Sequence, residues 1–264
     1  MITIRDLSSL RDYADCVALQ DETWGAGFSE RVPTAILRVS QMIGGVAAGA
    51  FDEHDHLVGF VFGLTGIREH ELVHWSDMLA VREELRGQGI GERLKQYQRD
   101  KVLALGVRSM LWTFDPLQAR NAHFNVNHLG ALPVEYVPDM YGNTGSALHG
   151  TLPTDRFIVR WQLDSPVART PASRQEAVPL ANPVAGDDVP VAASVAPDVA
   201  RVRVQIPADM SAVLAAGQEA SVRWRLNIRE VMTNLLARGY RVTSFSPTGG
   251  TDLPYYVLTS RQLA

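Results

Sequence analysis

The pattern of apolar and polar positions divides most of the chain into short strands and helices. A series of strands with two interspersed helices comes first, and two strand–helix repeats follow. The predicted strands cover residues 2–7, 46–52, 57–67, 72–81, 109–114, 134–141 and 156–163. The predicted helices cover 9–24, 33–43, a segment ending near 105, and 119–129. This order predicts an α/β fold in which helices cover both faces of a mixed sheet.

A change in composition separates this part from the C-terminal end. Residues 164–198 contain six prolines, eight alanines and six valines, and they contain no aromatic residue. Such a segment forms neither a continuous helix nor a central strand, so we interpret it as an extended, partly disordered linker. The alternative is an ordered arm that packs across the first domain. The predicted domains are therefore 1–163 and 199–264, joined by the linker 164–198.

Residues 199–264 have the pattern of a small β-α-β-β unit. Strands are predicted at 201–206, 240–245 and 255–258 around one long helix. An apolar stripe runs along that helix at spacings of four, three and four, formed by Trp224, Ile228, Val231 and Leu235. Because a unit of this size is marginally stable alone, we expect the stripe to pack on the first domain or on another copy of the chain. The second case implies a homo-oligomer formed through the C-terminal unit.

Composition and charge restrict the class of function. The chain has 264 residues, of which 46% are hydrophobic, and a formal net charge of −4, which argues against a nucleic-acid-binding role. The single cysteine, Cys16, excludes an intramolecular disulfide and a Cys-rich zinc site. The longest apolar runs, 42–51 and 58–67, are too short to span a membrane, and the start lacks the layout of a signal peptide. We therefore expect a cytoplasmic protein with no membrane association.

The glycine-rich segment at 86–91, Arg-Gly-Gln-Gly-Ile-Gly, lies between a predicted strand and a predicted helix. Glycines let the backbone turn with its N–H groups pointing inward, and the start of a helix favours anions, so this segment suits a pyrophosphate. The spacing is neither that of a Walker motif nor G-x-G-x-x-G. On spacing alone, a turn that merely starts a helix is the competing interpretation.

This segment resembles the acyl-CoA signature of the GNAT superfamily of N-acyltransferases, (Gln or Arg)-x-x-Gly-x-(Gly or Ala). The preceding residues 78–85 and the later helix end at 127–131, Asn-His-Leu-Gly-Ala, are similar to the elements that flank this signature in the family. The resemblance covers about residues 1–163 and implies a mostly antiparallel sheet. Residues 112–117, 120–122 and 152–156 resemble a bacterial branch of predicted acyltransferases, some of them associated with amino-acid N-succinylation.

The resemblance implies that acetyl-CoA or another acyl-CoA is the co-substrate, with no metal, and that a small-molecule amine attacks its thioester directly. It assigns the CoA pyrophosphate to the backbone of Gln88, Gly89, Ile90 and Gly91, with Arg86 and Gly87 shaping the approach. It places the pantetheine arm along Leu79 and Val81. Asn121 and Asn125 are four residues apart, so on an α-helix they share one face and become candidate CoA contacts. The alternative is that both are surface amides.

The catalytic residues follow less directly, because Val126 stands where the family usually has a tyrosine. Tyr141, where the next strand ends, or a water molecule is then the candidate acid for the leaving thiolate. Asp77 is the candidate general base. Strand alternation places Asp77 and Leu79 on the face opposite His74, which argues against a metal site there. A purely structural carboxylate is the competing interpretation for Asp77.

Asp155 and Arg156 precede the last strand of the first domain and are the candidate substrate residues. A guanidinium there suits a carboxylate, either on an amino-acid acceptor or on a succinyl group. The alternative is a surface Asp155–Arg156 ion pair that caps the turn. For the whole chain, the alternative to an N-acyltransferase is a non-catalytic acyl-CoA-binding module whose C-terminal tail binds a partner.

Overall fold

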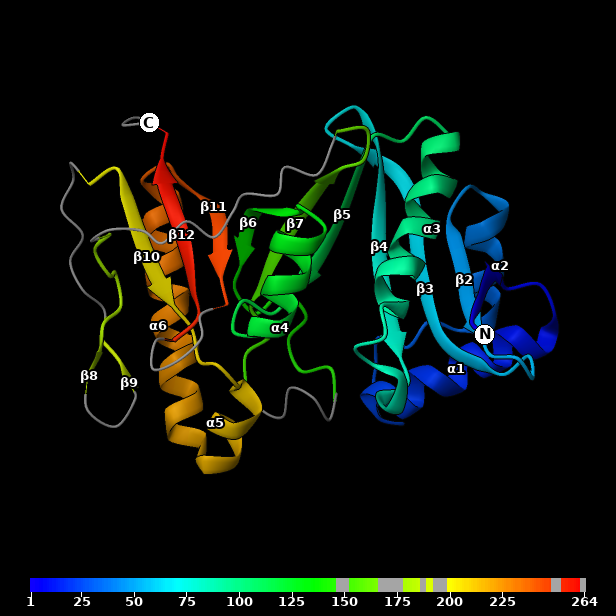
Figure 1. The fold of residues 1–264 in the computed structure, drawn as a ribbon, viewed down its shortest axis with the longest axis horizontal. Helices are drawn as coiled ribbons and strands as arrows, with labels where there is room; N and C mark the ends of the chain where they lie inside the picture. The colour runs from blue at the N-terminus through cyan, green and yellow to red at the C-terminus, as the bar shows by residue number, and fades with distance from the viewer. Residues whose placement is uncertain (146–151, 166–177, 186–188, 192–198, 248–252, 262–264) are drawn as a thin grey trace. The chain divides into compact units, whose positions relative to one another are not determined.

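The computed structural model describes residues 1–145, 152–165, 178–185, 189–191, 199–247 and 253–261 (Figure 1). The chain forms two compact units. Unit 1 comprises Met1–Trp112, Asn143–Gly150 and Trp161–Ser165, and unit 2 comprises Thr113–Gly142, Thr151–Arg160 and Pro166–Ala264. Unit 2 thus groups Thr113–Gly142 and Thr151–Arg160 with the C-terminal segment. The domain boundaries at 163 and 198 stay a prediction about the sequence.

Unit 1 is a meander of antiparallel strands with helices packed on it. The strands are β1 (Thr3–Asp6), β2 (Val46–Phe51), β3 (Leu57–Arg68) and β4 (Glu71–Val81). The helices are α1 (Leu10–Trp24), α2 (Thr34–Met42), the short η1 (Glu83–Leu85) and α3 (Ile90–Ala104). Every residue of β2 is buried, as expected for a strand covered on both faces. No described helix combines the length and the apolar composition needed to cross a membrane.

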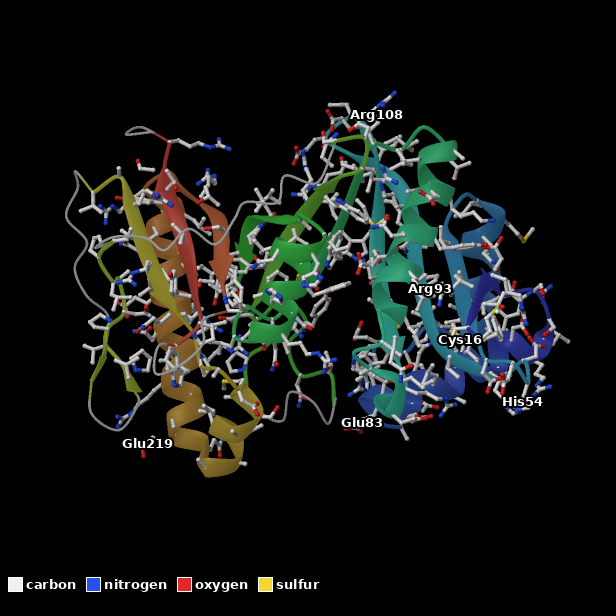
Figure 2. All side chains as sticks on the ribbon, in the orientation of Figure 1. Cys16, His54, Glu83, Arg93, Arg108 and Glu219 are labelled. Carbon is white, nitrogen blue, oxygen red and sulfur yellow. The ribbon has the colours of Figure 1, made fainter. Side chains whose placement is uncertain are left out.

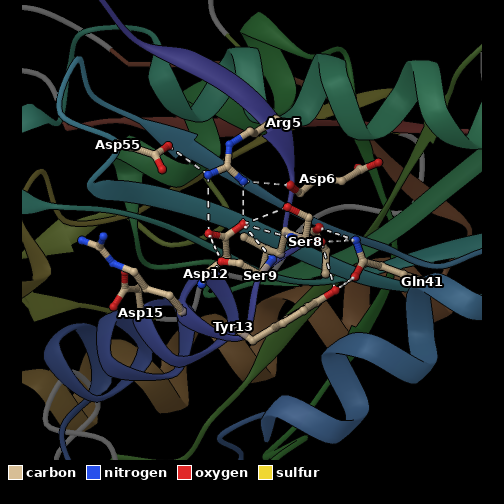
Figure 3. A network of polar contacts seen from close by, with 12 residues as sticks. Arg5, Asp6, Ser8, Ser9, Asp12, Tyr13, Asp15, Gln41 and Asp55 are labelled. Atoms are coloured by element: carbon tan, nitrogen blue, oxygen red, sulfur yellow. Dashed lines mark hydrogen bonds and ion pairs between the residues drawn. The ribbon is translucent and has the colours of Figure 1, made fainter.

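The start of α1 shows how local sequence fixes an element. Ser9 Oγ accepts a hydrogen bond from the Asp12 backbone N–H at 3.0 Å, and the Asp12 carboxylate accepts one from the Ser9 backbone N–H (Figure 3). Arg5 on β1 donates to the same carboxylate at 2.5 Å. Ser9 is therefore the N-cap of the predicted helix, and the hydrogen bond from Arg5 ties the start of α1 to the first strand.

Unit 2 contains two sets of strands and helices. The first set is β5 (Ser109–Phe114), α4 (Ala119–Ala122), the π-helix η2 (His123–His128), β6 (Leu132–Val137) and β7 (Arg156–Gln162), with β5 and β7 shared with unit 1. The second set is β10 (Arg201–Gln205), α5 (Met210–Ala216), α6 (Gln218–Ala237), β11 (Tyr240–Ser246) and β12 (Tyr255–Ser260). The strand orders are β1-β2-β3-β4-β5-β7-β6 and β10-β12-β11. The predicted mixed, mostly antiparallel α/β sheet is confirmed.

Three predicted elements differ from the structure. The predicted helix 119–129 is a single α-turn continued by a π-helix. The predicted strand 134–141 is β6, which ends at Val137, so Tyr141 lies in the following turn. The single long helix of the C-terminal unit is two helices, because the backbone is extended at Gly217 (φ 161°, ψ 147°) between α5 and α6.

The apolar stripe on α6 is buried inside unit 2. Its four residues are at most 5% exposed, and α6 packs on β11 and on β6. The stripe is therefore buried, as predicted, and its helix packs both on β11 of the C-terminal segment and on β6 of the first domain predicted from the sequence. A homo-oligomer formed through the C-terminal unit stays a prediction.

The predicted linker is described only in part, since 166–177, 186–188 and 192–198 lie outside the described residues. Residues 178–185 pack along β10. The Arg203 backbone N–H donates to Pro179 O, and Asn182 is fully buried, with its amide bonded to Gln205 and Asn227. A short hairpin, β8 (Val184–Ala185) with β9 (Val189–Pro190), follows. These residues are ordered, as in the alternative left open by the sequence, but the contacts described for them are with β10 and α6 of the C-terminal segment and not with the first domain.

Candidate functional site

The glycine turn lies directly before α3 in unit 1. Gly87 and Gly89 have φ values of +82° and +76°, in the left-handed region that side chains with a Cβ disfavour. A Cβ built on either residue meets no described atom within 4 Å, so the space in front of both is open. Gly89 is the N-cap residue of α3 and makes no side-chain cap, so no N-cap side chain occupies the first N–H groups of the helix next to this turn. The arrangement suits a phosphate group.

Arg86 shapes the entrance to this turn by bonding back to the preceding strand. Its Nε donates to the backbone oxygen of Val81, the last residue of β4, at 3.0 Å. The end of β4 and the start of the turn are thereby linked. Gly91, in the first turn of α3, approaches the Leu79 side chain of β4 closely enough that a Cβ there would lie 3.8 Å from it. The predicted CoA residues 79–91 therefore form one continuous surface along β4, the turn and α3.

A β-bulge interrupts β4 at Asp77. Phe62 of β3 pairs with Met78 and Gly63 pairs with Ser76, so Asp77 is the extra residue on β4. Because one residue is inserted, the side chains after the bulge change faces. Ser76 contacts α3 through Lys95, and Leu79 also lies against α3, beside Gly91. The expectation that Leu79 lies opposite His74 and Ser76 is therefore wrong, since it assumed unbroken alternation.

The bulge sets the environment of the Asp77 carboxylate. The residue is exposed, yet the protein around its carboxylate reduces hydration, and this desolvation raises the pKa of Asp77 above its usual value. The Trp75 indole N–H donates to Asp77 Oδ1 at 3.3 Å and opposes that shift. A raised pKa and access to solvent are what a general base working near neutral pH requires.

A buried polar network lies behind the bulge, between β4 and α3. Lys95 Nζ donates to Ser76 Oγ at 2.7 Å, and Ser76 Oγ donates to Gln98 Oε1 at 2.7 Å. Gln98 Nε2 lies 3.0 Å from His74 Nε2, and His74 Nδ1 lies 2.9 Å from Thr65 Oγ1. This chain of side-chain hydrogen bonds links β4 to α3 and to β3 on the N-terminal side of Asp77.

Lys95 is held in this network without a carboxylate among its described contacts. Its ammonium lies 3.9 Å from the centroid of the Trp112 ring, and the residue is 2% exposed. Burial lowers the pKa of Lys95 to about 7. Burial, with the charge of Lys95, lowers the pKa of His74 to about 3. His74 is therefore neutral near pH 7, while Lys95 titrates there.

The candidate CoA residues of unit 2 lie in two different helical elements, Asn121 in α4 and Asn125 in the π-helix η2. Leu129 N–H donates to Phe124 O, five residues back, so the four-residue rule of an α-helix does not hold here. Asn121 is exposed, whereas Asn125 is 4% exposed, so the two amides differ in their access to solvent. Val126 is buried as well, so the aliphatic side chain at the family's tyrosine position belongs to the core. The assignment of Asn121 and Asn125 to CoA stays a prediction.

Tyr141 and Arg156 lie close together in unit 2. The Tyr141 hydroxyl is 3.0 Å from Thr113 Oγ1 at the end of β5, and the Arg156 guanidinium carbon is 5.5 Å from the centroid of the Tyr141 ring. Arg156 is buried, and desolvation lowers its pKa although the charge of Asp115 acts against that shift. A hydroxyl and a guanidinium placed side by side suit an anionic group and the transfer of a proton to it.

Asp155 is fully buried and pairs with α6, not with its neighbour. Arg229 Nε and Nη2 donate to its two carboxylate oxygens at 3.0 and 2.5 Å, and the Tyr136 hydroxyl donates at 2.6 Å. Burial alone raises the pKa of Asp155, but these hydrogen bonds outweigh it and lower that pKa. Arg156 Nη1 instead donates to the Asp155 backbone oxygen at 3.0 Å. The alternative of a surface Asp155–Arg156 ion pair is therefore wrong.

A second buried ion pair joins α6 to the end of β5. Arg225 Nη1 and Nη2 donate to the Asp115 carboxylate oxygens at 2.9 and 2.6 Å, and both residues are buried. Arg156 Nη1 lies 3.9 Å from the same carboxylate. Asp115 therefore faces two guanidinium groups, one from α6 and one from β7.

Sequence reasoning missed these buried charges, although weak signals for them exist. Lys95 directly follows Leu94 on the apolar side of α3, and it is one of only two lysines in the chain. Arg225 and Arg229 each directly follow a residue of the α6 stripe and are four residues apart. Charged residues that lie beside a buried apolar stripe and recur at helical spacing indicate that their charges have buried partners.

Other reactive side chains lie apart from these candidate residues. Cys16 is buried in α1, and burial raises the pKa of its thiol to about 12, so it packs as a small apolar residue (Figure 2). His54 lies in the turn between β2 and β3, exposed to solvent. Within the described ranges, no group of three or more His, Cys, Asp or Glu residues is arranged to hold a metal ion.

Comparisons with known proteins identify the first part of the chain. Residues 14–130 match the acetyltransferase (GNAT) family. One chain in the crystal structure of the NatC complex bound to Gag peptide and CoA is 16% identical, with a TM-score of 0.50 over 61% of this chain and 98% of that chain. The ribosomal-protein-S18-alanine N-acetyltransferase from Escherichia coli is 15% identical, with a TM-score of 0.48 over 64% of this chain and 99% of that chain. No curated protein sequence matches the chain.

At 16% identity the structural likeness to the NatC chain shows the fold alone. The family match is more informative, because it spans the bulged strand β4, the glycine turn and the π-helix. Tyr141, Asp155 and Arg156 lie beyond it. Residues 14–130 therefore form a domain of the acetyltransferase (GNAT) family, the family of CoA-dependent N-acetyltransferases.

Proposed function

We propose that this enzyme moves an acyl group, acetyl or succinyl, from CoA to the amine of a small metabolite, with an amino acid as the leading class of acceptor. The observation that carries the proposal is the glycine turn, where Gly87 and Gly89 have left-handed backbones and open space lies before the first N–H groups of α3. The cytoplasmic location expected from the sequence is part of the same proposal.

The CoA side of the proposed site is formed by backbone groups. The N–H groups of residues 88–91 bind the pyrophosphate, and the β4 backbone at Leu79 and Val81 binds the pantetheine arm as an added strand would. The parallel pairing of β4 with β5 covers Val73–Trp75, and β4 runs on beyond it to Val81. A backbone N–H of this part of β4 stabilises the oxyanion that forms at the thioester carbonyl.

The proposed chemistry is a direct attack. The amine nitrogen bonds to the thioester carbon, the tetrahedral intermediate collapses, and the carbon–sulfur bond breaks with the electron pair leaving on sulfur. Asp77 accepts the proton that the amine loses. The thiolate receives a proton from Tyr141 or from water, because Val126 has none to give. Arg156 binds a carboxylate of the acceptor or of a succinyl group, and Asp155 supports Arg156 through its backbone oxygen.

The direct test is release of free thiol from acetyl-CoA and from succinyl-CoA in the presence of a panel of amines. We expect release with at least one amino acid. Asp77→Asn should lower kcat/KM by about 100-fold or more while CoA affinity, measured by calorimetry, stays unchanged. Glu71→Gln is the matched control, since Glu71 is an exposed carboxylate at the other end of the same strand and should be silent.

One observation favours a second candidate function. Val126 stands where the family usually has a tyrosine that protonates the leaving thiolate, and valine cannot donate a proton. The absence of this acid suits an acyl-CoA-binding module without catalysis. In that case calorimetry would show acyl-CoA binding, whereas no amine would release thiol from either donor. Thiol release that depends on an amine and on Asp77 would exclude this candidate.

A further inference from the structure

The C-terminal part of unit 2 repeats the element order of the segment before it. The first module, residues 109–162, runs β5, α4 with η2, β6 and β7, and the second module, residues 201–260, runs β10, α5 with α6, β11 and β12. In both modules the last strand lies between the other two, with β7 between β5 and β6, and β12 between β10 and β11 (Figure 1). Shared order and shared strand arrangement indicate one supersecondary unit used twice.

The junctions of the two modules agree as well. Each helix passes into the next strand through a glycine in the left-handed region, Gly130 at φ +69° and Gly239 at φ +86°. Each last strand follows a Leu-Pro pair, at 152–153 before β7 and at 253–254 before β12. These residues are not needed for a generic β-α-β-β unit, so their recurrence supports a common origin for the two modules.

The contacts between the modules are reciprocal. β6 packs on its counterpart β11, while η2 packs on β11 and α6 packs on β6. Each module thus places its helix on the middle strand in sequence of the other module, and these two strands pack on each other. An isologous two-fold interface between identical subunits has the same reciprocity. Hydrogen bonds cross in both directions, from Asn127 Nδ2 to Phe245 O at 3.0 Å and from the Tyr256 hydroxyl to Pro116 O at 2.8 Å.

The charged contacts across this interface come from α6 of the second module. Arg225 holds Asp115, directly after β5, and Arg229 holds Asp155, directly before β7. Both carboxylates adjoin the candidate acceptor residues. Asp115 faces Arg156, and Asp155 Oδ1 accepts the backbone N–H of Asp139, in the turn that leads to Tyr141.

We propose that the second module is a duplicate of the first that has become a positioning element for the acceptor side of the active site. Arg225 and Arg229 act as positioning residues. They clamp the ends of β5 and β7, and so hold Arg156 and the Tyr141 turn in the geometry that binds the acceptor. This proposal rests on the proposed function and extends it to a segment outside the family match.

A positioning role has a signature that general stabilisation lacks. The glycine turn and β4 belong to unit 1, whereas both clamped carboxylates belong to unit 2. Loosening the clamp should therefore weaken acceptor binding and leave CoA binding as it is. It should also release the Asp139 amide, because Arg229 Nη2 and that amide share Asp155 Oδ1 as their acceptor.

The test uses Arg229→Lys in the full chain, which keeps the charge and loses the fork, and Arg225→Lys as its buried counterpart. We expect acceptor KM to rise about tenfold with kcat changed less, and CoA Kd to stay within about twofold of wild type. NMR should show the Asp139 amide exchanging about tenfold faster, with the Ala131 amide as internal reference. Arg223→Lys is the matched control on α6, since Arg223 is exposed and pairs with exposed Glu219, labelled in Figure 2.

Arg229 is partly exposed, so its lysine variant tests the clamp even if the Arg225 variant does not fold. A folded Arg229→Lys chain with unchanged acceptor KM and unchanged Asp139 exchange would overturn the proposal. Loss of CoA affinity in parallel with acceptor affinity would overturn it too, because it would indicate general damage. If wild type releases no thiol with any amine, the proposed function fails instead, and the exchange rate of Asp139 still decides whether the clamp exists.

Discussion

The two units hold their candidate residues by different means. In unit 1 the CoA side depends on backbone conformation, with two left-handed glycines in the turn and a bulge at Asp77. In unit 2 the acceptor side depends on buried ion pairs between residues far apart in sequence, Asp115 with Arg225 and Asp155 with Arg229. The proposed CoA site, made of main-chain groups, is encoded locally, whereas the proposed acceptor site, held by ion pairs, depends on α6 of the C-terminal segment.

The two arrangements are also sensitive to different changes in the chain. A backbone site is damaged when a Cβ enters it or when φ can no longer be positive, while changes in nearby side chains matter little. A buried ion pair gains little over an apolar pair of similar shape, but removing one partner leaves an uncompensated charge. Unit 2 should therefore be the part of the molecule that is most sensitive to loss of its C-terminal segment.

The largest expected effect is that of a chain ending at Leu163. This truncation removes Arg225 and Arg229, leaves Asp115 and Asp155 without their guanidinium partners, and exposes the side of β6 that α6 covers. Breaking a buried pair costs roughly 3–5 kcal/mol, which for two pairs approaches the whole stability of a domain. We expect aggregation in light scattering and loss of the cooperative thermal transition. A monomeric truncated chain with the thermal midpoint of the full chain would show that the two regions are independent.

The next effect concerns the backbone-built side. Gly89→Val places a β-branched side chain at φ +76° and fills the space proposed for the pyrophosphate. CoA affinity measured by calorimetry should fall by about 100-fold or more, with the circular dichroism spectrum unchanged. Gly66→Val is the matched control, since Gly66 also faces open space but needs no positive φ. Equal CoA affinity in both variants would place the CoA site elsewhere.

Much of the fold could be predicted because its elements are encoded locally. Ser9 caps α1 through a reciprocal pair of hydrogen bonds, and β5 covers the predicted residues 109–114. The glycine turn was predictable for the same reason, since a short run of glycines between a strand and a helix permits few conformations.

The rest depends on features that the pattern of residues does not carry. The bulge at Asp77 and the π-turn at 123–128 each insert one residue into a regular period, and the period continues after them. Strict alternation therefore gave the wrong face for Leu79. The partners of Asp155 and Asp115 lie 74 and 110 residues away on α6, a separation that a single sequence does not connect.

The buried network of unit 1 offers a test of a side chain that supports the backbone-built site. Lys95 titrates near pH 7 when folded and near 10.5 when unfolded, so between these values the unfolded chain binds more protons. Stability must then rise with pH, by about 1.4 kcal/mol per pH unit, and Lys95→Met should abolish this rise. Denaturant unfolding at pH 7.5 and pH 9 should therefore differ by about 2 kcal/mol more in wild type than in the variant.

Lys101→Met is the matched control for this measurement. Lys101 is exposed, and its hydrogen bond to Asp6 raises its pKa. Its contribution to stability is therefore lost only above the measured range from pH 7.5 to pH 9. An identical pH slope in wild type and Lys95→Met would mean that the ammonium is solvated in the folded protein. The network would then not hold β4 next to Asp77.

The smallest effect belongs to Arg156, and it decides how the acceptor side recognises its ligand. Arg156→Lys keeps a cation beside Tyr141 but loses the planar fork that binds a carboxylate through two hydrogen bonds. KM for the carboxylate-bearing substrate should rise about tenfold, worth about 1.4 kcal/mol, while CoA affinity stays the same. Arg160→Lys, the same change on the same strand β7, should leave KM unaltered.

If Arg156→Lys lowers the thermal midpoint and leaves KM alone, Arg156 belongs with Arg225 and Arg229 as part of the clamp. The substrate carboxylate must then bind to a group outside it, and the ion pairs of unit 2 would serve only to hold its strands.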